Sequence, residues 1–223
     1  MTQYIDLSVA IRPHFRWGME RGLAKDYEKG DAFQTTWIKL IVHGYTHIDS
    51  PRHMVRDGLT SSDVPLSTTI GEASVIDLSD IAPNEEITAA RLAARGGHVR
   101  PGDIVLIKTC WDLKRDLDTA EFWTDAPYLS RDACEWLLST GLKALAPDFP
   151  QDYPIRQLLT GEVAPMEEFV SHDVLLRNGV ILIEYVGNFA ALKNPRTFIY
   201  ALPLRLPDSD GSPARVIAVE EDG

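Results

Sequence analysis

The sequence predicts a mixed α/β domain built on a substantial β-sheet. Runs rich in Val, Ile and Thr recur along the chain, are bounded by turn residues, and outnumber the helical patterns. Some of these runs directly follow a helical pattern, an order typical of strands and helices packed in layers. With 223 residues and a hydrophobic fraction of 44%, the chain is long enough for one large core, so we expect a single domain over residues 1–223.

Taken in order, the expected strands occupy residues 4–11, 33–43, 73–79, 103–109, 142–148, 180–186, 198–204 and 214–220. Of the three expected helices, residues 88–96 end on glycines, and residues 130–141 begin at a serine N-cap and stop at a glycine. Residues 166–179 carry acids in the first turn and close on Asn-Gly, which suits the helix dipole and a left-handed stop. The segments 13–31 and 149–165 are expected to be long loops, which are often functional in compact domains.

Charge and composition exclude several partners. The formal net charge is −11, which repels phosphate backbones and anionic membrane surfaces, so we expect neither nucleic acid nor a membrane as a partner. No apolar run approaches the ~20 residues needed to span a bilayer, and the first residues do not resemble a secretory signal, so a cytoplasmic location is expected. Cys110 and Cys134 are too few for a cysteine zinc site or a disulfide framework and are expected to be small buried hydrophobes.

The stretch HGYTHIDSPRH, residues 43–53, holds three of the six histidines in the chain. A β-prone run precedes it and its own residues are poor helix formers, so an extended backbone is expected. Alternate side chains of a strand share one face. That face would carry His43, Tyr45, His47 and Asp49, with His53 folding back over the group after Pro51.

Imidazole nitrogens and carboxylate oxygens are ligands that suit Zn²⁺, Mn²⁺ and Fe²⁺. Two histidines and one aspartate leave positions open for water, which a divalent metal acidifies toward pH ~7. A further histidine that is not a ligand could move protons. The alternative is a polar cluster at a strand end that is satisfied without an ion, although so many imidazoles packed together are electrostatically awkward.

Residues 171–186 supply a second candidate group. His172 falls on an expected helix, and Glu184 falls inside the very apolar run VILIEYV. A buried carboxylate is costly unless it has a partner, and a bound cation would provide one. An arginine, a backbone partner or a solvent-exposed strand face would serve the same purpose.

The stretch at 43–53 resembles the signature His-x-Gly-Thr-His-x-Asp-x-Pro-x-His of the cyclase family of metal-dependent hydrolases, which includes kynurenine formamidase and isatin hydrolase. The segments IDLS, PGDIVLIKTCW and APYLSRDACEWL also resemble family segments. One departure is Tyr45, which stands where the family has glycine and could place a bulky ring in the pocket. A second is DFPQD at 148–152, where many members show Asp-x-x-Ser-x-Asp. There, Asp148 and Asp152 could orient site residues or only cap the loop.

The resemblance implies a site for one or two divalent ions, Mn or Zn, in each chain. A first ion would be held by His43, His47 and Asp49. Asp49 would bridge to a second ion bound by His172, and Glu184 would touch both ions. Some family members work with one ion and others with two, so the number of ions stays open.

The resemblance also implies roles, a fold and an assembly. His53 would donate and accept the proton of catalysis, and Trp17 would contact the substrate, although Trp17 could equally be an ordinary half-buried aromatic. The implied fold is a β-rich α/β domain of the swivelling β/α/β type. Family members usually form homodimers or homotetramers, and residues 13–31 are the candidate segment to reach a neighbour's pocket.

We therefore expect a metal-dependent hydrolase that uses metal-activated water to cleave an amide, formamide or cyclic amide (lactam or imide) C–N bond of a small molecule. The chain has no Gly-x-Ser-x-Gly motif that would indicate a serine nucleophile. One alternative is a non-haem iron oxygenase with His47, Asp49 and His172 as its facial triad, which leaves the other candidate residues unused. The third is a metal-binding protein that is not an enzyme and whose coordination is closed.

Overall fold

The computed structural model describes residues 1–221, and most of their strands join one mixed sheet. The strand order is β1-β12-β11-β5-β7-β9-β10-β4, and β4 also pairs with β12, so the sheet closes into a barrel with β1 as an added strand. The strands β5, β7, β9 and β10 run parallel to their neighbours in that series, and the other pairings are antiparallel. The bounds are β1 Thr2–Asp6, β4 His47–Asp49, β5 Ile70–Asp77, β7 Ile104–Lys108, β9 Ala144–Pro147, β10 Ile181–Glu184, β11 Arg196–Pro203 and β12 Gly211–Glu221. This architecture confirms the expected β-rich α/β fold.

Alternation along the strands divides the core in two. In β7, Ile104 and Leu106 join the cluster inside the barrel, whereas Val105 and Ile107 join the cluster between the barrel and its helices. Both faces of a strand in such a parallel region are therefore buried, which explains its uninterrupted apolar sequence. The neighbouring β9 turns two small alanines inward, and these leave room for the larger side chains of the adjacent strands.

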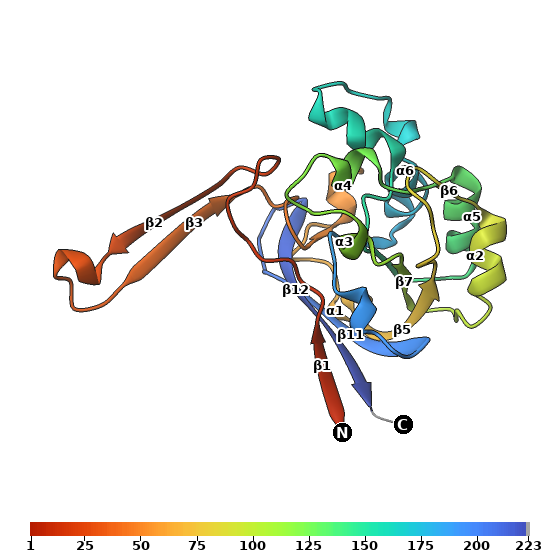
Figure 1. The fold of residues 1–223 in the computed structure, drawn as a ribbon, viewed down its shortest axis with the longest axis horizontal. Helices are drawn as coiled ribbons and strands as arrows, with labels where there is room; N and C mark the ends of the chain where they lie inside the picture. The colour runs from red at the N-terminus through yellow and green to blue at the C-terminus, as the bar shows by residue number, and fades with distance from the viewer. Residues whose placement is uncertain (222–223) are drawn as a thin grey trace.

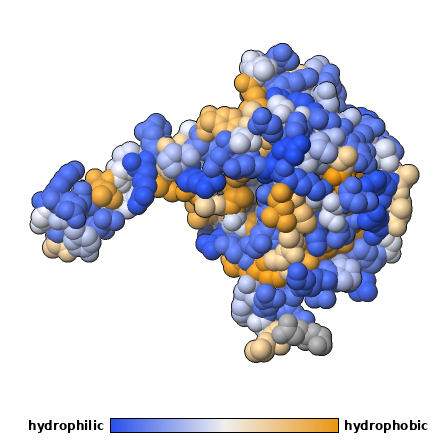
Figure 2. Space-filling model, in the orientation of Figure 1, coloured by the Kyte–Doolittle hydropathy of each residue, from blue (hydrophilic) through white to orange (hydrophobic). Residues whose placement is uncertain are grey.

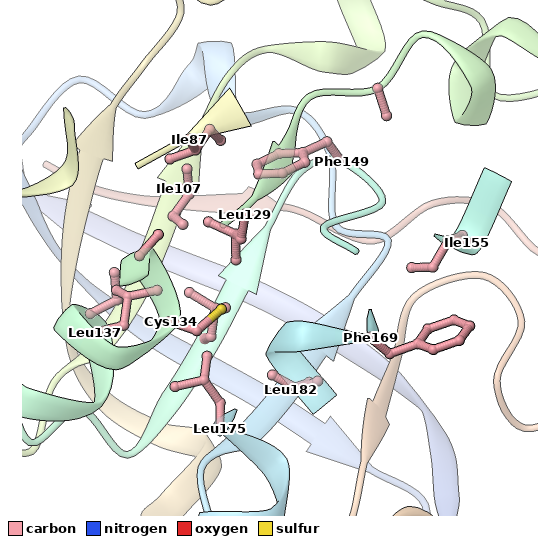
Figure 3. Packing of buried hydrophobic residues seen from close by; sticks show 14 of the residues in the cluster. Ile87, Ile107, Leu129, Cys134, Leu137, Phe149, Ile155, Phe169, Leu175 and Leu182 are labelled. Carbon is pink, nitrogen blue, oxygen red and sulfur yellow. The ribbon is translucent and has the colours of Figure 1, made fainter. Parts of the chain in front are cut away.

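Helices cover the outer face of the parallel strands (Figure 1). The predicted N-cap Ser130 accepts from the Ala133 amide, and Thr88 caps α2 in the same way by accepting from the Arg91 amide. Figure 3 shows Cys134 among the buried hydrophobic side chains beneath these helices, whereas Cys110 is only partly buried. The helices and short strands of this layer are α2 Ala89–Arg95, α3 Trp111–Lys114, α4 Glu121–Thr124, α5 Arg131–Ser139, α6 Val170–Val174, β6 Glu86–Ile87 and β8 Tyr128–Leu129, and α1 Leu66–Thr69 leads into β5.

The segment 13–31 is not a long loop, and this expectation was wrong. It contributes β2 (Met19–Lys25), which pairs with β3 (Thr35–Leu40) in an antiparallel hairpin that projects from the body (Figure 1). The strand could not be recognised from the sequence, because charged residues and Gly22 interrupt the apolar pattern of this segment. That glycine is required by the pairing, since a Cβ there would lie 2.5 Å from the ring of Trp37 on β3.

The expected helix at 166–179 is also interrupted. It divides into the 3₁₀ turn η4 (Met166–Glu168), α6, and the 3₁₀ turn η5 (Leu176–Asn178). Phe169 leaves the helical conformation, and the amide of Ser171 donates to Oδ1 of Asp152 instead of to a helix carbonyl. The predicted left-handed stop is present, since Gly179 has a φ of +84°.

Residues 149–165 do not form a featureless loop either, since they contain the 3₁₀ segment η3 (Tyr153–Leu159).

Within residues 1–221, no helix combines the length and apolar character that crossing a bilayer requires. The cytoplasmic location stays a prediction. Figure 2 shows hydrophobic side chains along the projecting hairpin and where it joins the body.

Candidate metal centre

Strand pairing places three of the candidate ligands on one face. β4 runs antiparallel to β10 with His47 opposite Glu184, and residues paired in this way point to the same side of the sheet. Ile48, between the two candidate ligands of β4, is packed inside the barrel. His47 and Asp49 therefore point outward, toward α6 and the segments around it.

His43 reaches the same place by a different route from the one expected. β4 begins only at His47, and the preceding residues form a turn in which Tyr45 has a φ of +59°. The expectation that residues 43–49 share one strand face is therefore wrong for residues 43–46, which precede the strand. The turn nevertheless brings Nδ1 of His43 to 2.6 Å from Oδ1 of Asp49. A left-handed tyrosine is strained, and it stands directly beside the candidate ligands.

The ring of Tyr45 packs into an aromatic cluster. Its centroid lies 4.9 Å from that of Trp17 and 6.3 Å from that of His14, and its hydroxyl donates to the carbonyl of Arg12. The carbonyl of Tyr45 accepts a hydrogen bond from Nδ1 of His47 across 2.9 Å. Tyr45, which replaces the glycine of the family signature, thus packs against Trp17 and accepts a hydrogen bond from His47.

The carboxylates of Asp49 and Glu184 each face imidazoles on two sides. Oδ1 of Asp49 lies 2.6 Å from His43 and 3.1 Å from Nε2 of His47, whereas Oδ2 lies 3.4 Å from Nε2 of His172. Oε2 of Glu184 lies 3.7 Å from Nε2 of His47, and Oε1 lies 3.5 Å from Nε2 of His172. Asp49 and Glu184 thus both lie between His47 and His172, and these two carboxylates could be shared by two cations.

The donor atoms fit a divalent cation. In one group His47, Asp49 and Glu184, and in a second group His43, Asp49 and His53, offer ligand atoms within 4.8 Å of one another. Nδ1 of His47 is occupied by the carbonyl of Tyr45, and its buried Nε2 makes no hydrogen bond of acceptable geometry, although Oδ1 of Asp49 lies 3.1 Å away. A buried ring nitrogen without a partner is costly, and a cation between the two carboxylates would satisfy it.

The charges around the site favour a cation. Burial lowers the pKa of His43, but the hydrogen bonds and charges of Asp49 and Asp210 outweigh burial and raise that pKa to about 9. Burial likewise lowers the pKa of His172, and Asp152 and Asp49 raise it well above its ordinary value. For Asp49, burial raises the pKa, but the neighbouring histidines hold it well below its usual range. The carboxylate of Asp49 therefore remains ionised and attracts positive charge.

His53 differs from the other histidines of the cluster. Burial, together with the charges on His43 and His172, lowers its pKa against the attraction of Asp49. Its ring lies over that of His43, with the centroids 4.1 Å apart, and its Nδ1 lies 3.4 Å from Oδ2 of Asp210. A neutral imidazole at the edge of the cluster can accept a proton.

Neighbouring residues hold the candidate ligands in place. Asp152 accepts from Nδ1 of His172 at 2.6 Å, and Gln151 donates its amide hydrogen to Oε1 of Glu184. Of the two readings left open for the DFPQD stretch, Asp152 orients a site residue. Asp148 instead caps a turn, because it accepts from the amide and hydroxyl of Thr109 and from the amide of Cys110.

Sequence reasoning missed Asp210. Its Oδ2 lies 2.9 Å from Nε2 of His43 and also faces His53, so it links the two imidazoles. It lies in the turn between β11 and β12, 167 positions from His43 in the chain. The only local signal is the turn-like composition of PDSDG, which predicts a bend and gives no indication of a partner.

Five members of the cluster form the floor of a pocket with a volume of about 800 Å³, namely His43, Asp49, His53, His172 and Glu184, whereas His47 is fully buried. Trp17 is 5% exposed and lines this pocket, so the expected site residue lies where a substrate would contact it, and its role stays a prediction. The remaining wall is largely apolar and comes from Phe15, Ile41, Ile155, Leu158, Met166 and Phe169. A concave, mostly apolar cavity with a few convergent polar groups is the usual form of a small-molecule site.

Fold and donor set together define an α/β protein with a pocket whose ligand atoms fit a divalent cation. The family model described as putative cyclase matches residues 5–151, and the chain belongs to this family. That membership confirms the resemblance seen in the sequence. Among similar curated proteins, the kynurenine formamidase of Bacillus mycoides (strain KBAB4) is 28% identical over 180 residues, which cover 81% of this chain and 77% of that protein. The kynurenine formamidase of Erythrobacter litoralis (strain HTCC2594) is 26% identical over 96% of this chain and 93% of its own.

Solved structures share the fold. An isatin hydrolase bound to the product analogue thioisatinate superposes with a TM-score of 0.84 and 22% identity, covering 99% of this chain and 93% of that one. A structure described as a potential metal-dependent hydrolase with cyclase activity gives a TM-score of 0.74 at 27% identity and covers both chains completely.

Proposed function

We propose that the protein hydrolyses the amide C–N bond of a small aromatic formamide, amide or lactam with the help of one or two divalent ions, Mn or Zn. The observation that carries this proposal is the cluster of His43, His47, Asp49, His172 and Glu184 at the floor of an aromatic-lined pocket. The named relatives are kynurenine formamidases, which are amide hydrolases, and one similar structure is described as a potential metal-dependent hydrolase.

A divalent metal on these ligands would act as a Lewis acid and would acidify water near neutral pH. The protein's own residues supply the rest. The apolar wall holds the substrate's ring and limits access of bulk water to the reacting carbonyl. Asp210 faces Nδ1 of His53, which leaves the Nε2 atom of that imidazole free to exchange a proton with the reacting groups.

The proton balance follows from these positions. Nε2 of His53 takes a proton from the attacking water while a C–O bond forms at the carbonyl carbon. The C–N bond then breaks, and the same nitrogen of His53 gives its proton to the leaving amine. The products are a carboxylic acid and an amine or, from a lactam, both groups in one molecule. This use of one neutral imidazole in both steps agrees with the lowered pKa of His53.

The test is an anaerobic assay of formanilide and of a simple lactam with enzyme loaded with Mn²⁺ or Zn²⁺. Release of aniline, or ring opening, under nitrogen supports hydrolysis. The iron oxygenase alternative instead predicts no anaerobic turnover and oxygen uptake with Fe²⁺. The oxygenase alternative also gives His43 and Glu184 no role, although both lie within the same cluster. A protein that binds metal and turns over neither substrate would favour the third, non-enzymatic alternative.

We also propose that the protein acts as a homodimer in which the β2–β3 hairpin contacts the second copy. An isolated two-stranded hairpin is only marginally stable in water, and this one projects with several apolar side chains exposed (Figure 2). These side chains include Tyr27, Phe33, Trp37 and Ile38. The same chain exposes apolar residues at the pocket edge, among them Leu158, Val163 and Met166. One chain thus carries two apolar surfaces, and two copies related by a two-fold axis can cover them mutually.

Light scattering after size-exclusion chromatography tests the assembly. We expect wild-type protein to elute as a dimer and the variant Trp37→Asp to elute as a monomer. Tyr4→Asp is the matched control, since Tyr4 is an exposed aromatic on β1 and outside the hairpin. A wild-type monomer at micromolar concentration, or a dimer unaffected by Trp37→Asp, would contradict the proposal.

A further inference from the structure

We propose that the substrate carries an anionic group, a carboxylate in the simplest case, and that Arg16 binds it at the side of the pocket away from the metal-ligand cluster. This inference rests on the proposed function and names the class of substrate that the same pocket selects. Three features carry it: an arginine without a counter-ion, an aromatic support that fixes its plane, and the aromatic side chains that lie between this arginine and the metal-ligand cluster.

Arg16 is the first feature. It lines the pocket and is partly buried. Within residues 1–221 its guanidinium makes no ion pair and no hydrogen bond, although the chain carries 33 acidic residues. Its neighbour Arg12 shows the usual outcome in such an acidic protein, since it pairs with Asp118 at 2.7 Å. An arginine that faces a pocket with its donors unused is suited to an anion brought by a ligand.

The aromatic support is the second feature. The Cζ atom of Arg16 lies 5.2 Å from the centroid of the Trp123 ring, which is buried. Stacking on an indole restricts the guanidinium to one plane, so less conformational entropy is lost when a carboxylate binds in the bidentate geometry. Lysine at this position would supply charge without the planar fork.

The order of the rings places Arg16 relative to the cluster. The ring of Tyr185 stacks on His47 with the centroids 5.8 Å apart, and the rings of Tyr185 and Trp123 are 6.4 Å apart. Trp17 packs edge-on against Tyr185 at 4.7 Å. Tyr185 and Trp17 line the pocket between the ligand cluster and Arg16. A substrate whose ring lies against these aromatic side chains can place its amide at the cluster and a ring substituent at the guanidinium of Arg16.

Electrostatics then fixes the direction in which such a molecule enters. Arg16 attracts an anionic substituent to its side of the pocket, whereas at the other end Asp49 and Glu184 are taken up by the cation of the proposed function. An anionic amide is therefore held with its reacting carbonyl at the cluster. A neutral amide of the same shape can bind in either direction, so it gains less from the pocket.

The experiment compares one neutral substrate and three carboxylated substrates in three proteins. The substrates are formanilide and ring-carboxylated formanilides with the carboxylate at the ortho, meta or para position. The proteins are wild type, Arg16→Gln, and the control Arg56→Gln, which removes an exposed arginine that lies outside the pocket. We expect Arg16→Gln to reduce kcat/KM for the best carboxylated substrate about 10- to 100-fold, the size expected for a charged hydrogen-bonded pair. Turnover of formanilide by Arg16→Gln should stay within about twofold of wild type.

A binding measurement separates this inference from the proposed function. Benzoate and benzamide are titrated against each protein, and quenching of tryptophan fluorescence reports occupancy beside Trp17 and Trp123. We expect benzoate to bind Arg16→Gln at least 10-fold more weakly than wild type and Arg56→Gln, and benzamide to bind all three alike. Equal benzoate affinities overturn the inference, whatever the enzyme hydrolyses. Equal losses for charged and neutral substrates also overturn it, because they indicate a packing role for Arg16. Absence of turnover with intact, Arg16-dependent benzoate binding contradicts the proposed function and supports the anion site.

Discussion

The Nδ1 atom of His172 donates a hydrogen bond across 2.6 Å to Oδ2 of Asp152, a carboxylate that also accepts from the amide and hydroxyl of Ser171. This contact directs Nε2 of His172 toward Asp49 and Glu184. It couples α6 to the DFPQD stretch, and it supplies the reason why the expected long helix is interrupted beside Ser171. The orientation of one candidate ligand thus depends on a residue that does not itself face the cluster.

Removing the charge of Asp152 should weaken metal binding. We expect Asp152→Asn to lower metal affinity about 10- to 100-fold, because the imidazole of His172 loses its fixed orientation and part of its basicity. Asp173→Asn is the control, since Asp173 is adjacent to His172 but pairs with the surface arginine Arg131. Competition with a chromophoric chelator measures both affinities. Equal affinities in the two variants would show that the hydrogen bond does not position His172.

A methyl group at Gly211 should displace His43. A Cβ at this position would lie 2.8 Å from Cε1 of His43 and 3.0 Å from the carbonyl oxygen of Ile48. We expect Gly211→Ala to weaken metal binding and to destabilise the fold by about 1–3 kcal/mol through overpacking. Gly97→Ala provides the control, because no atom lies within 4 Å of its added Cβ. Metal titration and urea unfolding measure the two effects, and unchanged metal affinity would refute the prediction.

His53 should move protons without holding the metal. We expect His53→Gln to lower kcat about 10²- to 10⁴-fold while the number of bound ions per chain stays the same. Because His53, His43 and Asp49 also lie close enough to share an ion, the metal content decides between the two roles. Loss of one equivalent of metal from His53→Gln, measured by mass spectrometry of the metal, would make this residue a ligand.

Acid stability should depend on Asp103. Burial raises the pKa of this carboxyl, but the hydrogen bonds from Arg196, Ser74 and the Arg100 amide outweigh burial and hold it below its ordinary value. A folded-state pKa below the unfolded one stabilises the protein above about pH 4, and this contribution is lost as the pH falls through the folded-state pKa. We expect Asp103→Asn to cost about 1–3 kcal/mol at pH 7 and to flatten the loss of stability below pH ~4.

Urea unfolding between pH 2 and 7 checks this dependence on Asp103. The exposed pair of Asp80 with Arg95 gives a control, because Asp80→Asn should change stability by less than about 1 kcal/mol. An Asp103→Asn profile parallel to that of wild type at every pH would contradict the account.

Local patterns predicted much of the fold, but they failed where a partner decided the structure. The apolar run of β7 and the serine N-cap of α5 carry their signals within a few residues. β2 carries none, because its strand exists through pairing with β3, and Gly22 is explained only by the ring of Trp37 above it. Propensity is overridden in such a case by tertiary contact.

In the candidate site, too, local patterns identified some residues, whereas others depend on tertiary contacts. His47 and Asp49 could be found from their spacing, because a strand places alternate residues on one face. The left-handed Tyr45 could not be foreseen, since a non-glycine residue with positive φ is held there by its surroundings. Asp210 was beyond reach for another reason: it faces His43 and His53 only after the barrel has closed and brought the β11–β12 turn beside β4.

The central claim is that the imidazoles and carboxylates at the pocket floor hold a cation on which hydrolysis depends. Metal analysis of freshly purified protein, combined with formanilide turnover before and after treatment with a chelator, tests it most directly. The account predicts one or two equivalents of Mn or Zn per chain, loss of turnover on chelation, and recovery when either ion is added back. Protein that contains no metal and hydrolyses the amide equally well in the presence of the chelator would contradict it.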